Sequence, residues 1–253
     1  MGKKQQPFSN VSFGFETVPE AEKTQRVRSL FNRVASRYDI MNDAMSLGVH
    51  RYWKHALVQS LSPRQGMTIL DMAGGTGDIA FRILDKCPSA QVTVCDMTLG
   101  MLSQGQIKGW NRGFLKALTW VCGNAEALPW PDQSYDAYTI AFGLRNITDP
   151  MQALREAHRI LKPGGRLLCL EFSKLQSGVL NTLYKTYSFQ LIPYLGRIIA
   201  NDQQAYQYLV ESIERFFDQE TLREMIRQSG FETVSYQNYM GGIAALHTAG
   251  RAL

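Results

Sequence analysis

Short apolar runs alternate with longer amphipathic stretches from residue 67 to residue 172. Short apolar runs predict buried strands, and stretches with apolar residues every three or four positions predict helices. The predicted strands are residues 67–71, 91–96, 117–122, 135–142 and 166–172, and the predicted helices are residues 77–86, 98–109 and 150–162. Regular alternation of strand and helix is typical of a parallel sheet with right-handed crossovers. The pattern therefore predicts an open α/β sheet.

The residues before this sheet predict a helical cap. Residues 1–19 are polar and are expected to be loosely docked. Residues 20–37 carry one apolar stripe at helical spacing, and residues 50–61 predict a second helix. We expect a single domain over residues 1–253, in which residues 1–66 form the cap and residues 67–172 form the cofactor-binding core.

The residues after the core do not continue the alternation. Residues 173–217 are rich in aromatic side chains, and a connection of this length is usually functional. Two interpretations stay open, a lid over an apolar substrate and an extra helical layer with its own core. Residues 218–229 then predict a helix, and residues 231–239 and 243–248 predict a closing hairpin of two strands. Such a hairpin is foreign to the simple dinucleotide fold and usual in methyltransferases.

Composition narrows the class of protein. The 253 residues are 45% hydrophobic and 19% charged, and no apolar run approaches the roughly 18 residues of a membrane-spanning helix. The net charge of +5 permits an anionic partner, but no basic tract or nucleic-acid motif is present, so no nucleic-acid partner is predicted. The four cysteines and four histidines lack metal-ligand spacing, so no metal site is predicted.

A glycine-rich turn follows the first predicted strand of the sheet. Residues 71–78 read DMAGGTGD and lead into a helical pattern. Glycines let the backbone approach a ligand closely because they have no Cβ atom. An open α/β sheet binds nucleotides at such a turn, outside the carboxyl end of a strand. We therefore expect the cofactor to lie over Gly74, Gly75 and Gly77.

The loop alone leaves two classes of cofactor open. The segment from Gly75 fits the G-x-G-x-x-A form of the dinucleotide fingerprint, and Asp96 lies about where a ribose-binding acid belongs. A pyrophosphate gains from basic neighbours, whereas the loop carries Asp71 and Asp78 and no Lys or Arg before Arg82. Two carboxylates suit the cationic groups of S-adenosylmethionine and repel phosphates. The charge pattern therefore favours S-adenosylmethionine over NAD(P).

Two further segments end strands on the same rim of the sheet. Residues 123–129 read GNAEALP, where the Asn124 amide can read an adenine edge. Residues 142–146 end the fourth strand, and Arg145 is expected to face the ligand crevice and handle substrate or a proton. The plainer alternatives, an asparagine in a turn and a salt-bridged arginine at a strand end, stay open.

These segments resemble the ubiquinone/menaquinone biosynthesis C-methyltransferases. The resemblance runs from about residue 13 to residue 248. The sheet motifs that carry it are residues 71–78, 123–129, 140–148 and 161–172. The more specific flanking motifs are residues 13–17, 34–39, 41–43, 206–213 and 242–247. The resemblance implies a class I methyltransferase fold, a Rossmann-like, mostly parallel seven-stranded sheet with helices on both faces, and it favours the ubiquinone branch.

The resemblance also implies the residues of the cofactor site. In that family S-adenosylmethionine is contacted by the loop threonine, the acid after the second strand, the Asn-Ala pair and a small residue of the fourth strand. The expected cofactor-binding residues are Asp71, Gly74, Gly75, Thr76, Gly77, Asp96, Met97, Asn124, Ala125 and Ala141. Many relatives have Ser in place of Ala141, so any contact there must rest on backbone or packing.

The implied reaction is methylation of a ring carbon of a polyprenyl benzoquinol of the 2-methoxy-6-polyprenyl-1,4-benzoquinol type, with demethylmenaquinol as a further acceptor. The ring carbon becomes nucleophilic once a phenol oxygen loses its proton. Arg145 is expected to stabilise the phenolate or relay a proton through water, because a free arginine is not a base. Asn146 and Tyr38 are expected to orient the ring. The reaction needs no metal or redox cofactor.

The expected partners are the quinol substrate, a membrane surface contacted peripherally, a quinone-synthesis complex and a second copy of the chain. The expected location is the bacterial cytoplasm or the cytoplasmic face of the inner membrane, or the matrix side of the mitochondrial inner membrane. The alternatives are a class I methyltransferase for another small apolar substrate, an NAD(P)-dependent oxidoreductase, and a catalytically silent scaffold.

Overall fold

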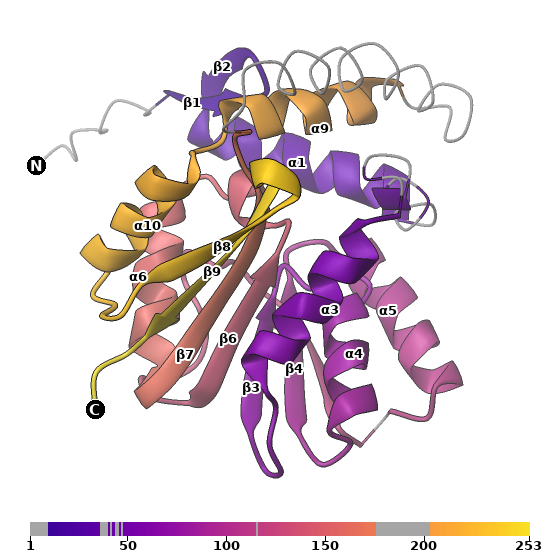
Figure 1. The fold of residues 1–253 in the computed structure, drawn as a ribbon. Coiled ribbons are helices and arrows are strands. Elements are labelled where there is room, and N and C mark those ends of the chain that lie inside the picture. The colour runs from indigo at the N-terminus through magenta and orange to yellow at the C-terminus, as the bar shows by residue number, and fades with distance from the viewer. Residues whose placement is uncertain are drawn as a thin grey trace, which may run out of the picture.

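One seven-stranded sheet forms the centre of the described part of the molecule (Figure 1). The computed structural model describes residues 10–35, 40, 42–43, 46, 48–114, 116–175 and 203–253. The strands of the sheet are β3 (Thr68–Met72), β4 (Gln91–Asp96), β5 (Leu118–Cys122), β6 (Tyr135–Ala141), β7 (Leu161–Phe172), β8 (Ser235–Tyr239) and β9 (Ala244–Gly250). The helices are α1 (Glu20–Val34), α3 (His50–Leu61), α4 (Asp78–Lys86), α5 (Leu99–Asn111), α6 (Pro150–Ile160), α9 (Gln203–Arg215) and α10 (Gln219–Gln228), with 3-10 turns η2 (Leu144–Asn146) and η4 (Met240–Gly242).

The strand order confirms the predicted architecture. The strands run β5-β4-β3-β6-β7-β9-β8, and β3 to β7 pair in parallel. Strand β9 pairs antiparallel with both β7 and β8, so the closing hairpin inserts its second strand beside the core. A seven-stranded, mostly parallel sheet with this C-terminal hairpin is the fold class that the sequence predicted.

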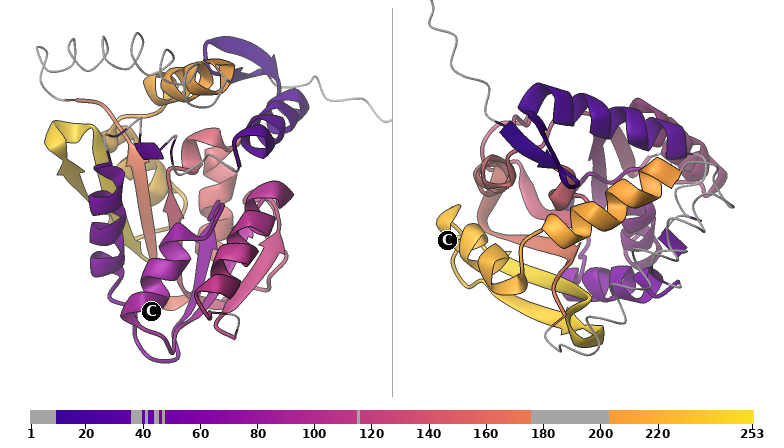
Figure 2. Two further views of the ribbon diagram at one scale, coloured as in Figure 1. Left: turned by 90° about the vertical axis from the view of Figure 1, so that its right-hand side faces the viewer. Right: turned by 90° about the horizontal axis from the view of Figure 1, so that it is seen from above.

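Helices cover both faces of the sheet and its upper edge. One buried cluster joins the sheet to α3 and α4 through residues such as Trp53 and Leu84, and a second joins it to α6 and α10 through Leu154 and Ile226. Helices α1 and α9 lie over the carboxyl ends of the parallel strands (Figure 1, and seen from above in Figure 2). Because the strands are buried on both faces, they read as nearly continuous apolar runs.

Residues 10–19 correct one expectation. They form a hairpin of β1 (Asn10–Phe13) and β2 (Glu16–Pro19) instead of a loosely docked tail. The hairpin is attached to helix α9, because Phe15 N donates to Glu211 Oε2 over 3.0 Å. Gly14 at the turn has a φ of +59°, a conformation that favours glycine. The predicted lid lies largely outside the described residues, because residues 176–202 are not among them.

Several element boundaries also differ from the prediction. Strand β7 begins at Leu161, because Leu161 already pairs with Tyr135 before an irregularity and the regular ladder from Arg166. The helix before it therefore ends at Ile160, two residues earlier than expected. Helix α6 begins as its sequence indicates, with Asp149 Oδ1 accepting from Gln152 N over 3.0 Å.

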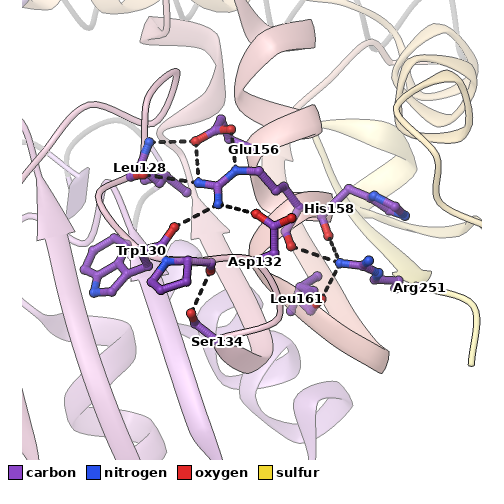
Figure 3. A network of polar contacts seen from close by, with 10 residues as sticks. Leu128, Trp130, Asp132, Ser134, Glu156, His158, Leu161 and Arg251 are labelled. Atoms are coloured by element: carbon purple, nitrogen blue, oxygen red, sulfur yellow. Dashed lines mark hydrogen bonds and ion pairs between the residues drawn. The ribbon is translucent and has the colours of Figure 1, made fainter.

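Arg251 caps the C-terminal end of helix α6 (Figure 3). Its Nη1 atom donates to the carbonyl oxygens of His158, Arg159 and Leu161 over 2.6–2.9 Å. The last carbonyls of a helix have no partner within the helix, and a cation is favourable near that end. A side chain that directly follows β9 thus caps the helix that precedes β7.

Replacing Arg251 by Ala is expected to lower the free energy of unfolding by about 2 kcal/mol, since hydrogen bonds from a charged donor are lost. The melting temperature should fall by about 4–8 °C for a chain of this size. Urea unfolding and thermal melts measure both. The control is Arg227→Ala, which breaks an exposed pair with Glu224 and should leave the melting temperature close to that of the wild type, because an exposed ion pair contributes little. Equal effects of the two substitutions would contradict this account.

Candidate active site

A cavity opens at the carboxyl ends of β3, β4, β5 and β6. Its empty space, which includes space open to solvent, is about 690 Å³. Strand β3 lies between β4 and β6, and this change of direction in the strand order is where doubly wound sheets bind ligands. The predicted site residues that line the cavity are Gly75, Asp96, Met97, Asn124, Ala125 and Asn146.

The other predicted residues lie beside or beneath this cavity. Asp71 and Thr76 are 1% and 3% exposed, and the structure places neither in the cavity wall. The remaining predicted residues of the described chain that do not line it are Gly74, Gly77, Ala141 and Arg145. Tyr38 lies outside the described residues. The cavity thus lies at the predicted loop and strand ends, and the predicted contacts with the cofactor stay predictions.

The glycines of the loop serve close packing as well as ligand approach. Gly75 and Gly77 have φ angles of +55° and +84°. A Cβ atom on Gly74 would lie 2.7 Å from Asp71 Oδ2 and 2.7 Å from Val94 Cγ1. The carboxyl group of Asp71 therefore fits directly beneath the loop, where only glycine leaves room for it.

Asp71 is a buried acid that supports the loop. Its Oδ1 atom accepts from Thr139 Oγ1 of the neighbouring strand over 2.8 Å. Burial raises the pKa of Asp71 to about 7, although Thr139 and Lys54 oppose the shift. Because this carboxyl is sealed from the cavity and partly neutral near pH 7, it is not the exposed anion that the sequence argument assumed.

Asp78 likewise corrects the charge argument. Its Oδ2 atom pairs with Lys54 Nζ at 2.9 Å and its Oδ1 atom pairs with Arg82 Nε at 2.8 Å. Burial raises the pKa of Asp78, but these two cations outweigh it and hold the pKa at about 2. The charge of Asp78 is therefore satisfied within the protein. Lys54 comes from α3, 24 residues before Asp78 in the chain, so the charge pattern of the loop alone does not include it.

Asp71→Asn is expected to change how stability depends on pH. A folded pKa of about 7 lies above the usual 3.8, so between these values the folded state holds a proton that the unfolded state has released. Wild-type stability therefore falls from about pH 4 to pH 7, and an asparagine cannot titrate. Relative to wild type, the variant should gain roughly 3 kcal/mol between pH 5 and pH 8. Urea unfolding at both pH values measures this, and parallel pH profiles would contradict it.

Asp96 is held in place by the backbone of two turns. Its Oδ2 atom accepts from Gly75 N over 3.0 Å, and its Oδ1 atom accepts from Thr98 N over 2.8 Å. Burial raises the pKa of Asp96, and these amide hydrogen bonds oppose the shift. Each oxygen keeps further acceptor capacity toward the cavity. The geometry suits a carboxylate that receives two hydroxyl groups of a ribose.

The loop after β5 is anchored by side chains of α6 (Figure 3). Glu156 Oε2 accepts from Leu128 N over 2.7 Å, and Arg159 Nη2 donates to Leu128 O over 3.1 Å. Arg159 also pairs with Glu156 and with Asp132, each at 2.8 Å. Closer to the cavity, Glu126 Oε1 accepts from Thr148 N over 3.0 Å. The loop that carries Asn124 and Ala125 is therefore anchored on the C-terminal side of these two residues.

Two strand ends meet in strained backbone at the cavity. Ala73 after β3 and Phe142 after β6 have φ angles of +51° and +57°, which costs about 1–2 kcal/mol for residues other than glycine. A Cβ atom on Gly143 would lie 2.5 Å from Ala73 Cβ. Strained backbone of this kind is found most often at functional sites. Here the two strained residues lie where the ends of the two central strands approach each other.

Arg145 does not face the cavity, so the expectation that it does is wrong. Its Nη1 atom pairs with Glu171 Oε1 at 2.7 Å and donates to Phe142 O over 2.6 Å. The side chains of Arg145 and Glu171 are 4% and 2% exposed. The salt-bridge alternative therefore describes this arginine. The sequence alone could not distinguish a crevice-facing arginine from a salt-bridged one, because the partner Glu171 lies 26 residues away on the neighbouring strand β7.

Helix α1 supplies cavity residues that the sequence reading missed. Thr24, Val27, Arg28 and Phe31 line the cavity opposite the loop. Val27 and Phe31 belong to the apolar stripe that predicted the helix, and no contact with a ligand was predicted for it. The sequence does offer one indication that α1 could cover a ligand, because this helix belongs to the predicted cap that precedes the sheet.

Comparisons with known proteins agree with this geometry. The model of the ubiE/COQ5 methyltransferase family matches residues 19–251. The Paracoccus denitrificans protein named ubiquinone/menaquinone biosynthesis C-methyltransferase UbiE is 56% identical over 93% of this chain and 94% of its own. A zebrafish (Danio rerio) protein named 2-methoxy-6-polyprenyl-1,4-benzoquinol methylase, mitochondrial, is 47% identical over 93% of this chain and 83% of its own.

Solved structures of low identity share the fold. An S-adenosylmethionine-dependent methyltransferase of Thermotoga maritima, described as a possible histamine N-methyltransferase, has a TM-score of 0.61 at 20% identity and covers 88% of this chain and 99% of its own. The [4+2]-cyclase SpnF has a TM-score of 0.69 at 17% identity, with 91% and 96% covered. The fold therefore hosts more than one chemistry, and the family match at high identity decides between them. The oxidoreductase alternative is accordingly wrong, and the chain belongs to the ubiE/COQ5 methyltransferase family, an S-adenosylmethionine-dependent C-methyltransferase.

Proposed function

We propose that this enzyme methylates a ring carbon of a polyprenyl benzoquinol of the 2-methoxy-6-polyprenyl-1,4-benzoquinol type, in ubiquinone biosynthesis. The observation that carries the proposal is the 47% identity, across 93% of this chain, to a relative named for that acceptor. The bacterial relatives are named for both ubiquinone and menaquinone biosynthesis, so demethylmenaquinol is a second acceptor to test. A cavity with apolar walls from Val27, Phe31 and Phe142 is compatible with either ring.

The reaction needs positioning and charge control from the protein. Loss of a proton from a phenol oxygen gives the ring carbon the electron pair that attacks the sulfonium methyl group. The carbon–sulfur bond breaks, its electron pair goes to sulfur, and S-adenosylhomocysteine leaves. Loss of the ring proton from the methylated carbon restores aromaticity. Holding the two reactants in line supplies a large part of the barrier reduction.

We propose a role for each of the following side chains, supported by its place in the structure or by the family resemblance. Asp96 binds the ribose, and the Asn124–Ala125 loop binds the adenine. Asn146 lines the cavity beside Phe142 and contacts the acceptor ring. Arg145 acts from behind the wall, where it fixes Phe142 O and compensates Glu171. Tyr38 keeps its predicted role in orienting the ring, outside the described residues.

A side-by-side assay tests the proposal. Purified enzyme with labelled S-adenosylmethionine is given a short-tailed demethyl benzoquinol or demethylmenaquinol, and mass spectrometry identifies the methylated position. Ring methylation of the benzoquinol is expected. If the enzyme binds S-adenosylmethionine but methylates neither acceptor, another small substrate or a scaffold role replaces this proposal.

The acceptor also bears on where the enzyme works. A polyprenyl tail resides in the membrane, so we propose peripheral contact with the cytoplasmic face of a bacterial inner membrane or the matrix side of the mitochondrial one. In the described segments no helix is long and apolar enough to cross a membrane. Association with a quinone-synthesis complex or with a second copy of the chain stays a prediction.

A further inference from the structure

Tyr208 on helix α9 makes direct contact with the cavity residue Asn146. Its hydroxyl donates to Asn146 Oδ1 over 3.1 Å. The tyrosine ring stacks on Phe13 of β1, with 4.2 Å between ring centroids and 22° between ring planes. Tyr208 is only 4% exposed. Two segments far apart in the sequence therefore hold this hydroxyl at the wall of the active site.

Burial fixes the direction of this hydrogen bond. A buried hydroxyl proton without an acceptor is unfavourable, and among the described residues Asn146 Oδ1 is the acceptor that receives it. Burial also raises the pKa of Tyr208 well above its usual value. The phenol therefore keeps its proton at physiological pH and acts as a donor.

The orientation of the Asn146 amide follows from that direction. An asparagine side chain has one acceptor oxygen and one NH₂ group with two donors. Tyr208 does not line the cofactor cavity, whereas Asn146 does. Since Oδ1 is bound to Tyr208, the amide group left for a ligand is the Nδ2 donor. Within the described part of the chain, no residue accepts a hydrogen bond from Nδ2.

We propose that Tyr208 is a positioning residue, which holds the Asn146 amide so that Nδ2 donates to the ring oxygen of the acceptor as negative charge collects there. The inference rests on the proposed function. A donor that is already oriented stabilises a developing oxyanion without having to rearrange during the reaction. Without the Tyr208 hydroxyl the amide is free to rotate and present Oδ1, which repels a phenolate.

Tyr208→Phe separates this role from packing, because it keeps the ring that stacks on Phe13. We expect kcat to fall about 10–100-fold, with the Kd for S-adenosylmethionine and the melting temperature close to wild type. Asn146→Asp should lose at least as much, since a carboxylate accepts from Tyr208 but offers no donor. Adding Tyr208→Phe to Asn146→Ala should have no further effect on kcat. The matched control is Tyr135→Phe, which removes a partly buried hydroxyl bonded to Thr93 and should leave kcat unchanged.

The inference would be overturned if Tyr208→Phe kept the wild-type kcat. It would also be overturned if Tyr135→Phe lowered kcat by as much as Tyr208→Phe.

A second measurement does not depend on turnover. A short-tailed 2-methoxyphenol with a nitro group as chromophore is bound to the complex with S-adenosylhomocysteine, and its ionisation is followed by absorbance. An oriented donor lowers the apparent pKa of the bound phenol, so Tyr208→Phe and Asn146→Ala should both raise it by about one unit relative to wild type and Tyr135→Phe. An unchanged value in Tyr208→Phe overturns the positioning role. If the phenol ionises as expected in every variant but no quinol is methylated by wild type, the proposed function fails and the positioning role stands.

Discussion

Asp96→Ala should weaken S-adenosylmethionine binding at least about 100-fold and thereby abolish methylation at ordinary cofactor concentrations. The substitution removes charge-assisted hydrogen bonds to the ribose, each about 1.5–3 kcal/mol. It also releases Gly75 N and Thr98 N, which the carboxylate now satisfies at 3.0 and 2.8 Å. The loop thus loses its anchor at the same time as the ligand loses its acceptor. Isothermal titration calorimetry with S-adenosylmethionine measures the change.

Asp96→Asn gives the sharper version of this experiment. Each oxygen of the wild-type carboxylate accepts from a different backbone amide, and an asparagine has only one oxygen. Its NH₂ group would therefore face a backbone N–H, so the loss should approach that of alanine. The matched control is Asp85→Ala on α4, half exposed and paired with Arg112 at 2.8 Å, which should bind normally. Near-normal affinity in Asp96→Asn would contradict the assigned geometry.

Glu171→Ala should be the most destabilising single change at the site, by about 3–5 kcal/mol, because it leaves the Arg145 charge buried without its partner. The remaining contacts of the guanidinium are Phe142 O and the ring of Phe172, 5.3 Å away. The melting temperature should fall by roughly 6–20 °C at 2–4 °C per kcal/mol. Urea unfolding measures the free energy directly.

The double substitution Arg145→Met with Glu171→Leu is the informative companion. Replacing both members of a buried ion pair by apolar groups is often neutral, so much of the lost stability should return. Arg112→Met at the exposed pair with Asp85 should cost less than about 1 kcal/mol. If Glu171→Ala is no worse than Arg112→Met, the buried pair does not support the wall of the cavity. If the stable double variant retains full activity, Arg145 has no role in the reaction.

The sheet could be predicted because its signals are local. Parallel strands buried on both faces read as apolar runs, and the loop at residues 71–78 carries its own turn chemistry. The helix start at Asp149 and the hairpin at β8 and β9 are local in the same way. These features need no knowledge of what packs against them, so the order of elements and the place of the cavity both follow from sequence.

The errors came from partners distant in the chain. Asp78 was counted as a free anion, but Lys54 neutralises it from α3. Arg145 was placed in the crevice, but Glu171 on β7 draws it behind the wall. The choice of S-adenosylmethionine was right, although its charge argument was wrong. The hairpin of residues 10–19 depends on α9, through Phe15 and Glu211, 196 residues apart. These partners are 24 to 196 residues apart in the chain, so a local sequence pattern does not contain both members of a pair.

The place of β9 has a consequence for how the chain folds as it is made. Strand β9 lies between β7 and β8, so the outer edge of β7 has no partner until residues 244–250 have been synthesised. That edge belongs to one of the most apolar strands of the sheet, including Leu167, Leu168 and Leu170. An open apolar edge invites pairing with other chains. The nascent protein is therefore exposed to aggregation between the synthesis of β7 and that of β9, when the strands of its cofactor cavity have already been made.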